Sequence, residues 1–109
     1  MPQPPFSTIV KRTGEVVPFD QEKITVAIYN AAAAHDRELS EQLSDQVVAA
    51  LAGTYSDADP PTVEEIQDVV ERVLIANGHA KTAKSYIVYR HERAKMRAHR
   101  RQGKVEHLP

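Results

Sequence analysis

Three positively charged side chains lie close together in the N-terminal part of the sequence. Lys11 and Arg12 follow a short β-forming run, and Lys23 falls in the first turn of a predicted helix. A hairpin that folds back toward the start of that helix brings these cations near one point. Ammonium and guanidinium groups bind phosphate oxygens, and the free N–H groups of a helix N-terminus also favour anions. The pattern predicts a polyphosphate site, and nucleotide binding is the leading hypothesis.

Other kinds of chemistry have less support in the sequence. The chain has no Cys, which excludes disulfides, thiolate zinc sites and Cys nucleophiles. The histidines are scattered and form no His-x-x-x-His pair, so we predict no protein metal site. A phosphate loop and a Gly-x-Gly-x-x-Gly motif are also missing from the sequence. We expect no catalysis, and Mg²⁺ can accompany a bound triphosphate, coordinated mainly by phosphate oxygens and water.

Length and composition indicate one globular domain. The sequence has 109 residues, of which 41% are hydrophobic and 27% charged, with a net charge of −1. That balance gives no overall field that would attract nucleic acid or a membrane. No apolar run approaches membrane-spanning length, and the first residues lack the basic and apolar regions of a signal peptide. We therefore expect a cytoplasmic protein.

The charges are distributed unevenly along the chain. Seven of the 14 Lys and Arg residues lie between positions 90 and 104, and acidic residues are concentrated between Asp57 and Glu71. The C-terminal end is thus a basic arm, and one alternative is a nucleic-acid-binding module that uses it. The arm is short and no aromatic residues alternate with its charges, which makes nucleic acid a poor fit. A helical interaction module with a degenerate nucleotide site is another alternative.

Turn signals near the N-terminus predict a β-hairpin. Residues 1–6 contain three prolines and are expected to form a disordered lead-in. Residues 7–12 and 15–19 read as strands, joined at Thr13–Gly14, because Gly tolerates the positive φ of a tight turn. Pro18 restricts the second strand to a sheet edge or to a strand end. Because two strands alone are marginally stable, this hairpin must pack on helices.

Capping signals predict four helices after the hairpin. Asp20 is a good N-cap for the first, Ser40 can cap the second, and Gly53 stops the second. Thr62 and Glu65 form a capping box at the start of the third helix.

The spacing of apolar residues predicts the rest of the third helix and the whole of the fourth helix. Apolar residues from Ile66 to Leu74 recur at helical spacing, Asn77–Gly78 ends the helix, and the fourth runs from about Ala80 through Ala98. We expect an α+β fold, a small four-helix bundle capped by an N-terminal β-hairpin. The domain is expected to span residues 7–100, followed by a frayed tail at residues 101–109.

Four separated segments make the sequence similar to the ATP-cone domain. They are Val10-Lys11-Arg12-x-Gly14, Phe19-Asp20-x-x-Lys23-Ile24, Thr62-Val63-Glu64-Glu65-Ile66-Gln67-x-Val69-Val70-Glu71 and Ala83-Lys84-Ser85-Tyr86-Ile87-Val88-Tyr89-Arg90. The resemblance covers about residues 9–93. It implies an allosteric module that binds ATP or dATP, usually at the N-terminus of ribonucleotide reductases, where it switches the oligomeric state of the enzyme.

The resemblance also implies roles for individual residues. Lys11, Arg12 and Lys23 correspond to phosphate-binding cations. Asp20 corresponds to a position near the base or the helix start, and Gln67 to one near the ribose. Either of two arginines on the last helix supplies the distal phosphate contact. The complete implied nucleotide-binding set is Val10, Lys11, Arg12, Asp20, Lys23, Gln67, Arg90 and Arg93.

The sequence departs from the family pattern in places. Thr13 stands where Asp is most common before the turn Gly, which should alter hairpin stability only. Val17 stands where some relatives carry an acidic residue that helps to read the nucleotide, so base and sugar discrimination stay open. The chain lacks the Cys residues of the zinc ribbon in a related bacterial repressor, and it lacks the catalytic barrel of a reductase. We therefore expect an excised domain or a free-standing ATP-cone.

Several of these residues also have a purely structural interpretation. The paired hairpin cations can be solvated, and Asp20 is first of all a helix cap. Tyr86 and Tyr89 are expected to be packed aromatics, and stacking of one of them on an adenine base is the alternative. Arg90 lies in line with apolar positions, so it either pairs with an acid or faces the phosphate site, because an unpaired buried guanidinium is costly.

Overall fold

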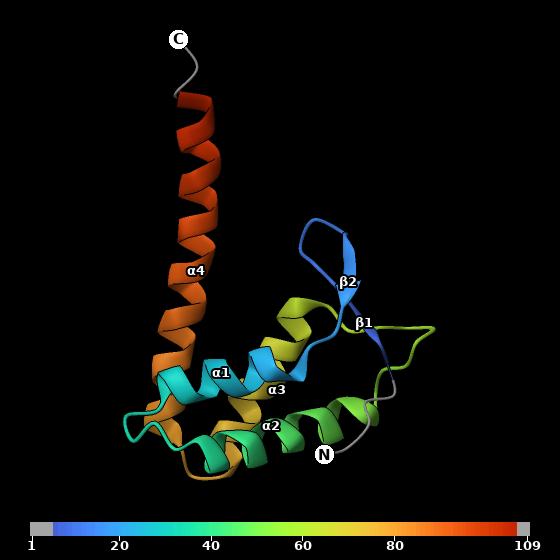
Figure 1. Ribbon diagram of the computed structural model, residues 1–109, viewed down its shortest axis with the longest axis vertical. Coiled ribbons are helices and arrows are strands. Elements are labelled where there is room, and N and C mark those ends of the chain that lie inside the picture. Colours follow the sequence, from blue (N-terminus) through green and yellow to red (C-terminus); the bar gives the residue numbers. More distant parts are fainter. Residues whose placement is uncertain (1–5, 107–109) are drawn as a thin grey trace.

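The structure, a computed structural model, describes residues 6–106 and contains a two-stranded antiparallel sheet followed by four helices (Figure 1). The helices pack in a ring, with α1 against α2, α2 against α3, α3 against α4, and α4 against α1. The predicted α+β architecture is confirmed. The elements are β1 (Thr8–Val10), β2 (Val16–Pro18), α1 (Gln21–Ala31), α2 (Arg37–Ala52), α3 (Val63–Ala76) and α4 (Ala80–Glu106).

The hairpin has shorter strands and a longer loop than the sequence predicted. Ile9 pairs with Val17 in the middle of the ladder, and residues 11–15 form the loop. The backbone N–H of Lys11 donates to the Glu15 carbonyl at 2.8 Å, which closes this loop. Gly14 has a φ of 90°, so the turn requires the left-handed conformation that Gly adopts without a Cβ clash.

Backbone pairing fixes the hairpin to the start of α3. The N–H of Val10 donates to the Pro61 carbonyl at 3.0 Å, and Val10 forms a parallel bridge with Thr62. Ile9 packs against the hydrophobic core. The hairpin is therefore supported by the bundle, as the marginal stability of two isolated strands requires.

Phe6 belongs to the core and not to the predicted lead-in. Its side chain is 1% exposed, and its ring meets that of Phe19 edge-on with centroids 4.9 Å apart. Burial of such a side chain stabilises a fold by roughly 1.5–3 kcal/mol, which outweighs the disorder that the neighbouring prolines suggest. Residues 1–5, the rest of that predicted lead-in, lie outside the described residues.

The helix starts follow their N-cap residues, with one correction. The Asp20 carboxylate accepts from the Glu22 N–H at 3.0 Å, as expected of an N-cap. Ser40 was predicted to cap α2, but Asp36 does so by accepting from the Leu39 N–H. Ser40 is instead buried one turn inside the helix, where its hydroxyl donates to the Asp36 carbonyl at 2.7 Å.

The capping box predicted for α3 is present. The Glu65 N–H donates to the Thr62 hydroxyl at 3.1 Å, and the Thr62 N–H donates to the Glu65 carboxylate at 2.9 Å. Asn77 caps the C-terminus, followed by Gly78 at a φ of 80°. Both ends of α3 are therefore set by local sequence, as predicted.

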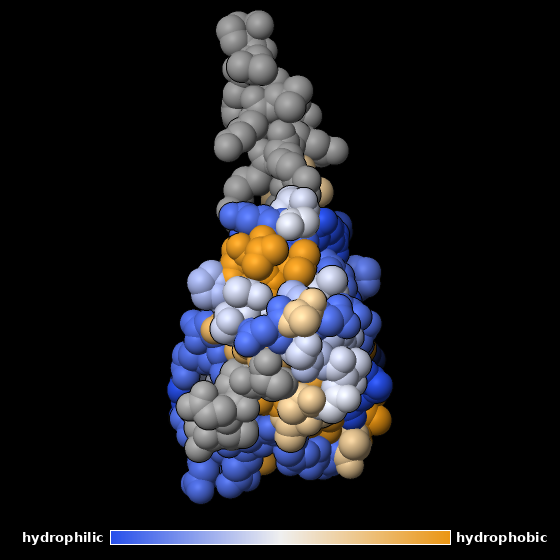
Figure 2. Space-filling model, turned by 90° about the vertical axis from the view of Figure 1, so that its right-hand side faces the viewer, coloured by the Kyte–Doolittle hydropathy of each residue, from blue (hydrophilic) through white to orange (hydrophobic). Residues whose placement is uncertain are grey.

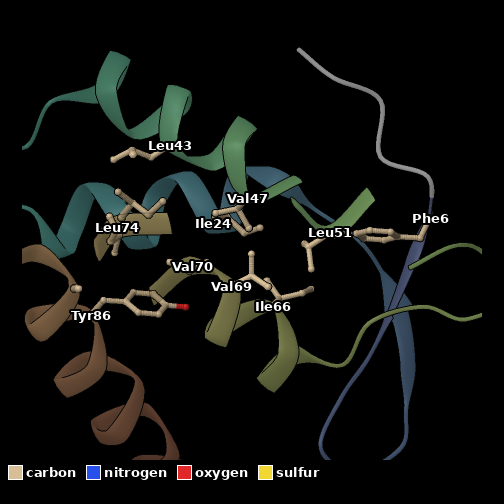
Figure 3. Close-up of a cluster of buried hydrophobic side chains, with 12 residues drawn as sticks. Phe6, Ile24, Leu43, Val47, Leu51, Ile66, Val69, Val70, Leu74 and Tyr86 are labelled. Carbon is tan, nitrogen blue, oxygen red and sulfur yellow. The ribbon is translucent and has the colours of Figure 1, made fainter. Parts of the chain in front are cut away.

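The core lies between the four helices, with α3 supplying its central row (Figure 3). The apolar stripe of α3 faces inward, as its helical period predicted. Leu51 of α2 and Leu74 of α3 are 0% exposed. The buried cluster consists of Phe6, Ile24, Ile28, Leu43, Val47, Leu51, Ile66, Val69, Val70, Leu74, Ala83 and Tyr86.

Helix α4 is longer than predicted and its second half extends beyond the bundle (Figure 1). It continues past the predicted end at Ala98, through part of the predicted tail, to Glu106; residues 107–109 lie outside the described residues. Tyr86 is buried as expected, whereas Tyr89 is 43% exposed, with its ring centroid 6.4 Å from that of Tyr86. No helix within residues 6–106 combines the length and apolar character needed to cross a membrane.

Candidate functional site

The two adjacent cations of the hairpin lie in its loop and are exposed to solvent. The Lys11 Nζ is 3.8 Å from a carboxylate oxygen of Glu15 within the same loop. The Arg12 Nε donates to a carboxylate oxygen of Glu64, in the first turn of α3, at 3.1 Å. The exposed fractions of the Lys11 and Arg12 side chains are 53% and 60%, so an incoming anion can reach both.

The hairpin also exposes an apolar face beside these cations. Val10 and Val16 pair across the two strands, so their side chains share one face of the sheet. Val16 is 58% exposed. Figure 2 looks onto the side of the molecule that carries the hairpin and shows a hydrophobic patch at the hairpin's height, among hydrophilic surroundings. A flat apolar group can lie against such a face.

The start of α1 is held firmly against α2. The Gln21 side-chain amide donates to the Ser44 hydroxyl at 3.0 Å and to the Asp45 carboxylate at 2.7 Å. Lys23 lies two residues further on and is exposed. Among the residues whose side chains the structure describes, it has no ion pair, which leaves its ammonium group available to an anion.

One face of α3 carries a row of polar and acidic residues. Glu64, Asp68 and Glu71 are spaced four and three residues apart, so they lie on the same side of the helix. Gln67 is half-buried and borders this row. At a rise of 1.5 Å per residue, the row is about 10 Å long.

Arg90 of α4 pairs with the far end of this row. Its guanidinium donates to Asp68 at 2.9 Å and to Glu71 at 2.8 Å, and its side chain is 24% exposed. Burial lowers the pKa of Arg90, but the hydrogen bonds to the two carboxylates outweigh it and the pKa is raised. Of the two alternatives for Arg90, pairing with an acid is the one observed. Arg93 is exposed and makes no ion pair with another residue of the described chain.

Helix α3 therefore contacts predicted site residues of both the hairpin and α4. Arg12 contacts its first turn and Arg90 contacts its second and third turns. In Figure 1 the hairpin and the second half of α4 rise from the same side of the bundle, with the start of α3 between them. This arrangement gives an exposed α3 face with cations at both ends.

The sequence matches the family model of the ATP cone domain over residues 7–95. The chain belongs to the ATP-cone family. Relatives include a vitamin B12-dependent ribonucleoside-diphosphate reductase from Thermoplasma acidophilum, 48% identical over 97 residues that cover 82% of this chain and 12% of the relative.

Two other relatives are also ribonucleotide reductases. One is a ribonucleoside-diphosphate reductase subunit alpha from Chlamydia muridarum, 34% identical over 90% of this chain and 10% of the relative. Another is an anaerobic ribonucleoside-triphosphate reductase from Escherichia coli, 33% identical over 78% of this chain and 12% of the relative. This ATP-cone chain thus spans about a tenth of the length of these reductases.

A shallow groove of about 300 Å³ lies elsewhere on the ATP-cone domain, between α2 and α3. None of the eight predicted site residues lines it. The groove is lined by Ala50, Leu51, Thr54, Tyr55, Val69, Arg72, Val73 and Ala76.

A titratable pair beside this groove supports the start of α3. The Tyr55 hydroxyl donates to the Glu65 carboxylate at 2.5 Å. This hydrogen bond raises the pKa of Tyr55 to about 12 and lowers the pKa of Glu65. Glu65 is the capping-box residue of α3, so the bond to Tyr55 ties that box to the loop that follows α2.

Sequence reasoning missed Glu64 as a contact of Arg12. Its place in the first turn of a capped helix was visible in the sequence, but the contact depends on how the hairpin pairs with residues 61–62. Among residues 6–96, whose side chains the structure describes, no cluster of three or more His, Asp or Glu side chains is suited to a metal ion.

Proposed function

We propose that this ATP-cone domain is an allosteric regulatory module that binds ATP or dATP on the exposed face between the hairpin and α4. The observation that carries the proposal is the contact of exposed Arg12 with Glu64 in the N-terminal turn of α3, with exposed Lys11 next to Arg12 in the hairpin loop. Exposed cations next to a helix N-terminus suit a polyphosphate, because both contribute positive potential and N–H donors. The family match over residues 7–95 supports the same ligand class.

In this proposal the hairpin and α1 hold the triphosphate. Lys11, Arg12 and Lys23 bind phosphate oxygens, and Mg²⁺ accompanies the nucleotide. Asp20 keeps Lys23 in place by capping α1. The apolar hairpin face formed by Val10 offers a surface to the base.

The ribose and the distal phosphate are proposed to face α3 and α4. Gln67 lies at the border of the exposed α3 face, within reach of a ribose hydroxyl. Between the two arginines of α4, Arg93 is the better distal phosphate ligand. Arg90 would first have to leave two carboxylates, whereas Arg93 has no ion pair among the described residues.

The proposed partner is a ribonucleotide reductase, and the domain itself performs no catalysis. The relatives at 33–48% identity are reductases of which the match to this chain covers only 10–12%. ATP and dATP differ by one 2′-hydroxyl, so a switch requires that they stabilise different conformations or oligomeric surfaces. We propose self-association that depends on the nucleotide, in the cytoplasm. The molecular mass in solution should differ between ATP and dATP, and identical masses with both ligands bound would contradict such a switch.

Isothermal titration calorimetry with ATP, dATP and GTP tests the binding itself. We expect both adenine nucleotides to bind the folded domain at submillimolar concentration. A Lys11→Ala/Lys23→Ala double variant should fold normally and lose affinity, because each charge-assisted contact contributes on the order of 1.5–3 kcal/mol. A Lys84→Ala variant, which removes an exposed cation outside the site, is the matched control. Lack of adenine nucleotide binding at millimolar concentration would sink the proposal.

A further inference from the structure

An ion pair occupies the phosphate-binding position of the hairpin. The Arg12 Nε donates to a Glu64 carboxylate oxygen at 3.1 Å, and the two side chains are 60% and 33% exposed. An ion pair exposed to this degree contributes little to the stability of a fold. Its position in the middle of the proposed nucleotide site therefore calls for a functional explanation.

The backbone brings these two side chains together. Val10 and Thr62 form a parallel bridge. Arg12 lies two residues after Val10, and Glu64 lies two residues after Thr62. The hydrogen bond from the Val10 N–H to the Pro61 carbonyl strengthens this register. The docking of β1 on the start of α3 therefore brings the two side chains together, and this docking does not depend on the ion pair.

A carboxylate and a phosphate compete for the same guanidinium donors. Both are anions with oxygen acceptors that fit the planar fork of Arg. A phosphate that approaches Arg12 must displace Glu64 or remain next to its negative charge. Both alternatives weaken binding relative to a site in which this carboxylate is absent.

We propose that Glu64 is an intramolecular competitor for phosphate at Arg12, and that a triphosphate must displace it. This inference rests on the proposed function, because it assumes that Arg12 is a phosphate ligand. Glu64 lowers nucleotide affinity and joins the hairpin loop to α3 in the unliganded domain. Nucleotide binding then exchanges this link for a phosphate contact, which changes how the loop is attached to α3.

The experiment is a double-mutant cycle of ATP affinity, measured by calorimetry on the full 109-residue chain. Glu64→Gln removes the charge while the Thr62–Glu65 capping box stays intact. We expect it to tighten ATP binding by about tenfold, equivalent to about 1.4 kcal/mol. Glu41→Gln removes the same charge from an ion pair with Arg37 on α2, away from the site, and should change affinity by less than about twofold.

The Arg12→Ala background separates competition from a general effect of charge. With Arg12 removed, Glu64→Gln should no longer tighten ATP binding, because the competition acts through that guanidinium. Equal tightening in both backgrounds, or an unchanged Glu64→Gln affinity, overturns the inference and leaves the proposed function intact. If the folded wild-type chain binds no ATP at millimolar concentration, the proposed function fails and this inference fails with it.

An independent readout uses the unliganded protein. Hydrogen exchange should become faster at the loop amides of residues 11–15 in the Glu64→Gln variant, because the loop loses its side-chain link to α3. In the wild-type chain, ATP should break the link between Arg12 and Glu64. The phosphate contacts should then slow exchange at the same loop amides. Identical exchange in the unliganded wild-type and Glu64→Gln proteins would show that Glu64 does not hold the loop.

Discussion

At the scale of single residues, two neighbouring arginines of α4 are predicted to have different roles, one in stability and the other in phosphate binding. Arg90 bridges Asp68 and Glu71 on α3, while Arg93 is exposed one turn further along. Arg90→Ala should lower the free energy of unfolding by about 1–2 kcal/mol, because it removes two charge-assisted hydrogen bonds. Arg93→Ala should change it by less than about 0.5 kcal/mol.

Urea denaturation and ATP calorimetry on both variants check this division of roles. We expect Arg93→Ala to weaken ATP binding by about tenfold or more, as the loss of one charge-assisted phosphate contact implies. Arg90→Ala should chiefly lower the urea midpoint. A stable Arg90→Ala protein with lost ATP affinity, beside an Arg93→Ala protein that binds normally, would reverse the assignment.

The Tyr55–Glu65 hydrogen bond predicts a pH-dependent contribution to stability. This bond lowers the folded-state pKa of Glu65 from its ordinary value of 4.5. Stability from the ionised carboxylate is therefore fully present above about pH 4.5 and is lost as pH falls through the folded-state pKa. Tyr55→Phe should cost about 1 kcal/mol at pH 7.

Urea midpoints of the wild-type and Tyr55→Phe proteins at pH 7 and pH 3 measure this contribution. The difference between the two proteins should be smaller at pH 3 than at pH 7, because the contribution of the ionised Glu65 declines as the pH falls from 4.5 toward and through its lowered folded-state pKa. A difference of the same size at both pH values would show that the bond does not depend on the carboxylate charge.

At the scale of elements, the start of α3 supports both the helix and the hairpin. Thr62 caps α3 and also bridges Val10 of β1. Thr62→Ala should cost about 1 kcal/mol, the usual effect of losing an N-cap hydroxyl. For a domain of this size, that corresponds to a fall in Tm of about 4–8 °C.

Thermal unfolding followed by circular dichroism checks the role of this cap. Thr54→Ala, at an exposed position just after α2, serves as the control and should leave Tm nearly unchanged. Equal Tm values for the Thr62→Ala and wild-type proteins would mean that the capping box does not stabilise α3 in solution.

The elements that local chemistry determines were predictable from the sequence. The capping box of Thr62 and Glu65, the apolar stripe of α3 and the turn at Gly14 each depend on residues within a few positions of one another. The start of α2 was placed wrongly because Asp36 and Ser40 are both good caps, and tertiary packing buries Ser40. Phe6 was misplaced for a similar reason, since contact with Phe19 outweighs the local proline content.

At the scale of the whole molecule, the site depends on distances that local patterns do not encode. The sequence identified Lys11, Arg12 and Lys23 as cations of one hairpin–helix unit. It did not reveal that Arg12 meets Glu64, or that Arg90 pairs with both Asp68 and Glu71. Those contacts arise from the docking of the hairpin and α4 on α3, which involves residues far apart in the chain.

The central claim is that adenine nucleotides bind on the α3 face between the hairpin and α4. An NMR titration of backbone amide shifts with ATP tests it most directly. The largest shifts should appear at residues 10–12 and 20–23, at Gln67 and at Arg93. Shifts confined to the α2–α3 groove around Tyr55 and Val73, or unchanged spectra at millimolar ATP, would contradict it.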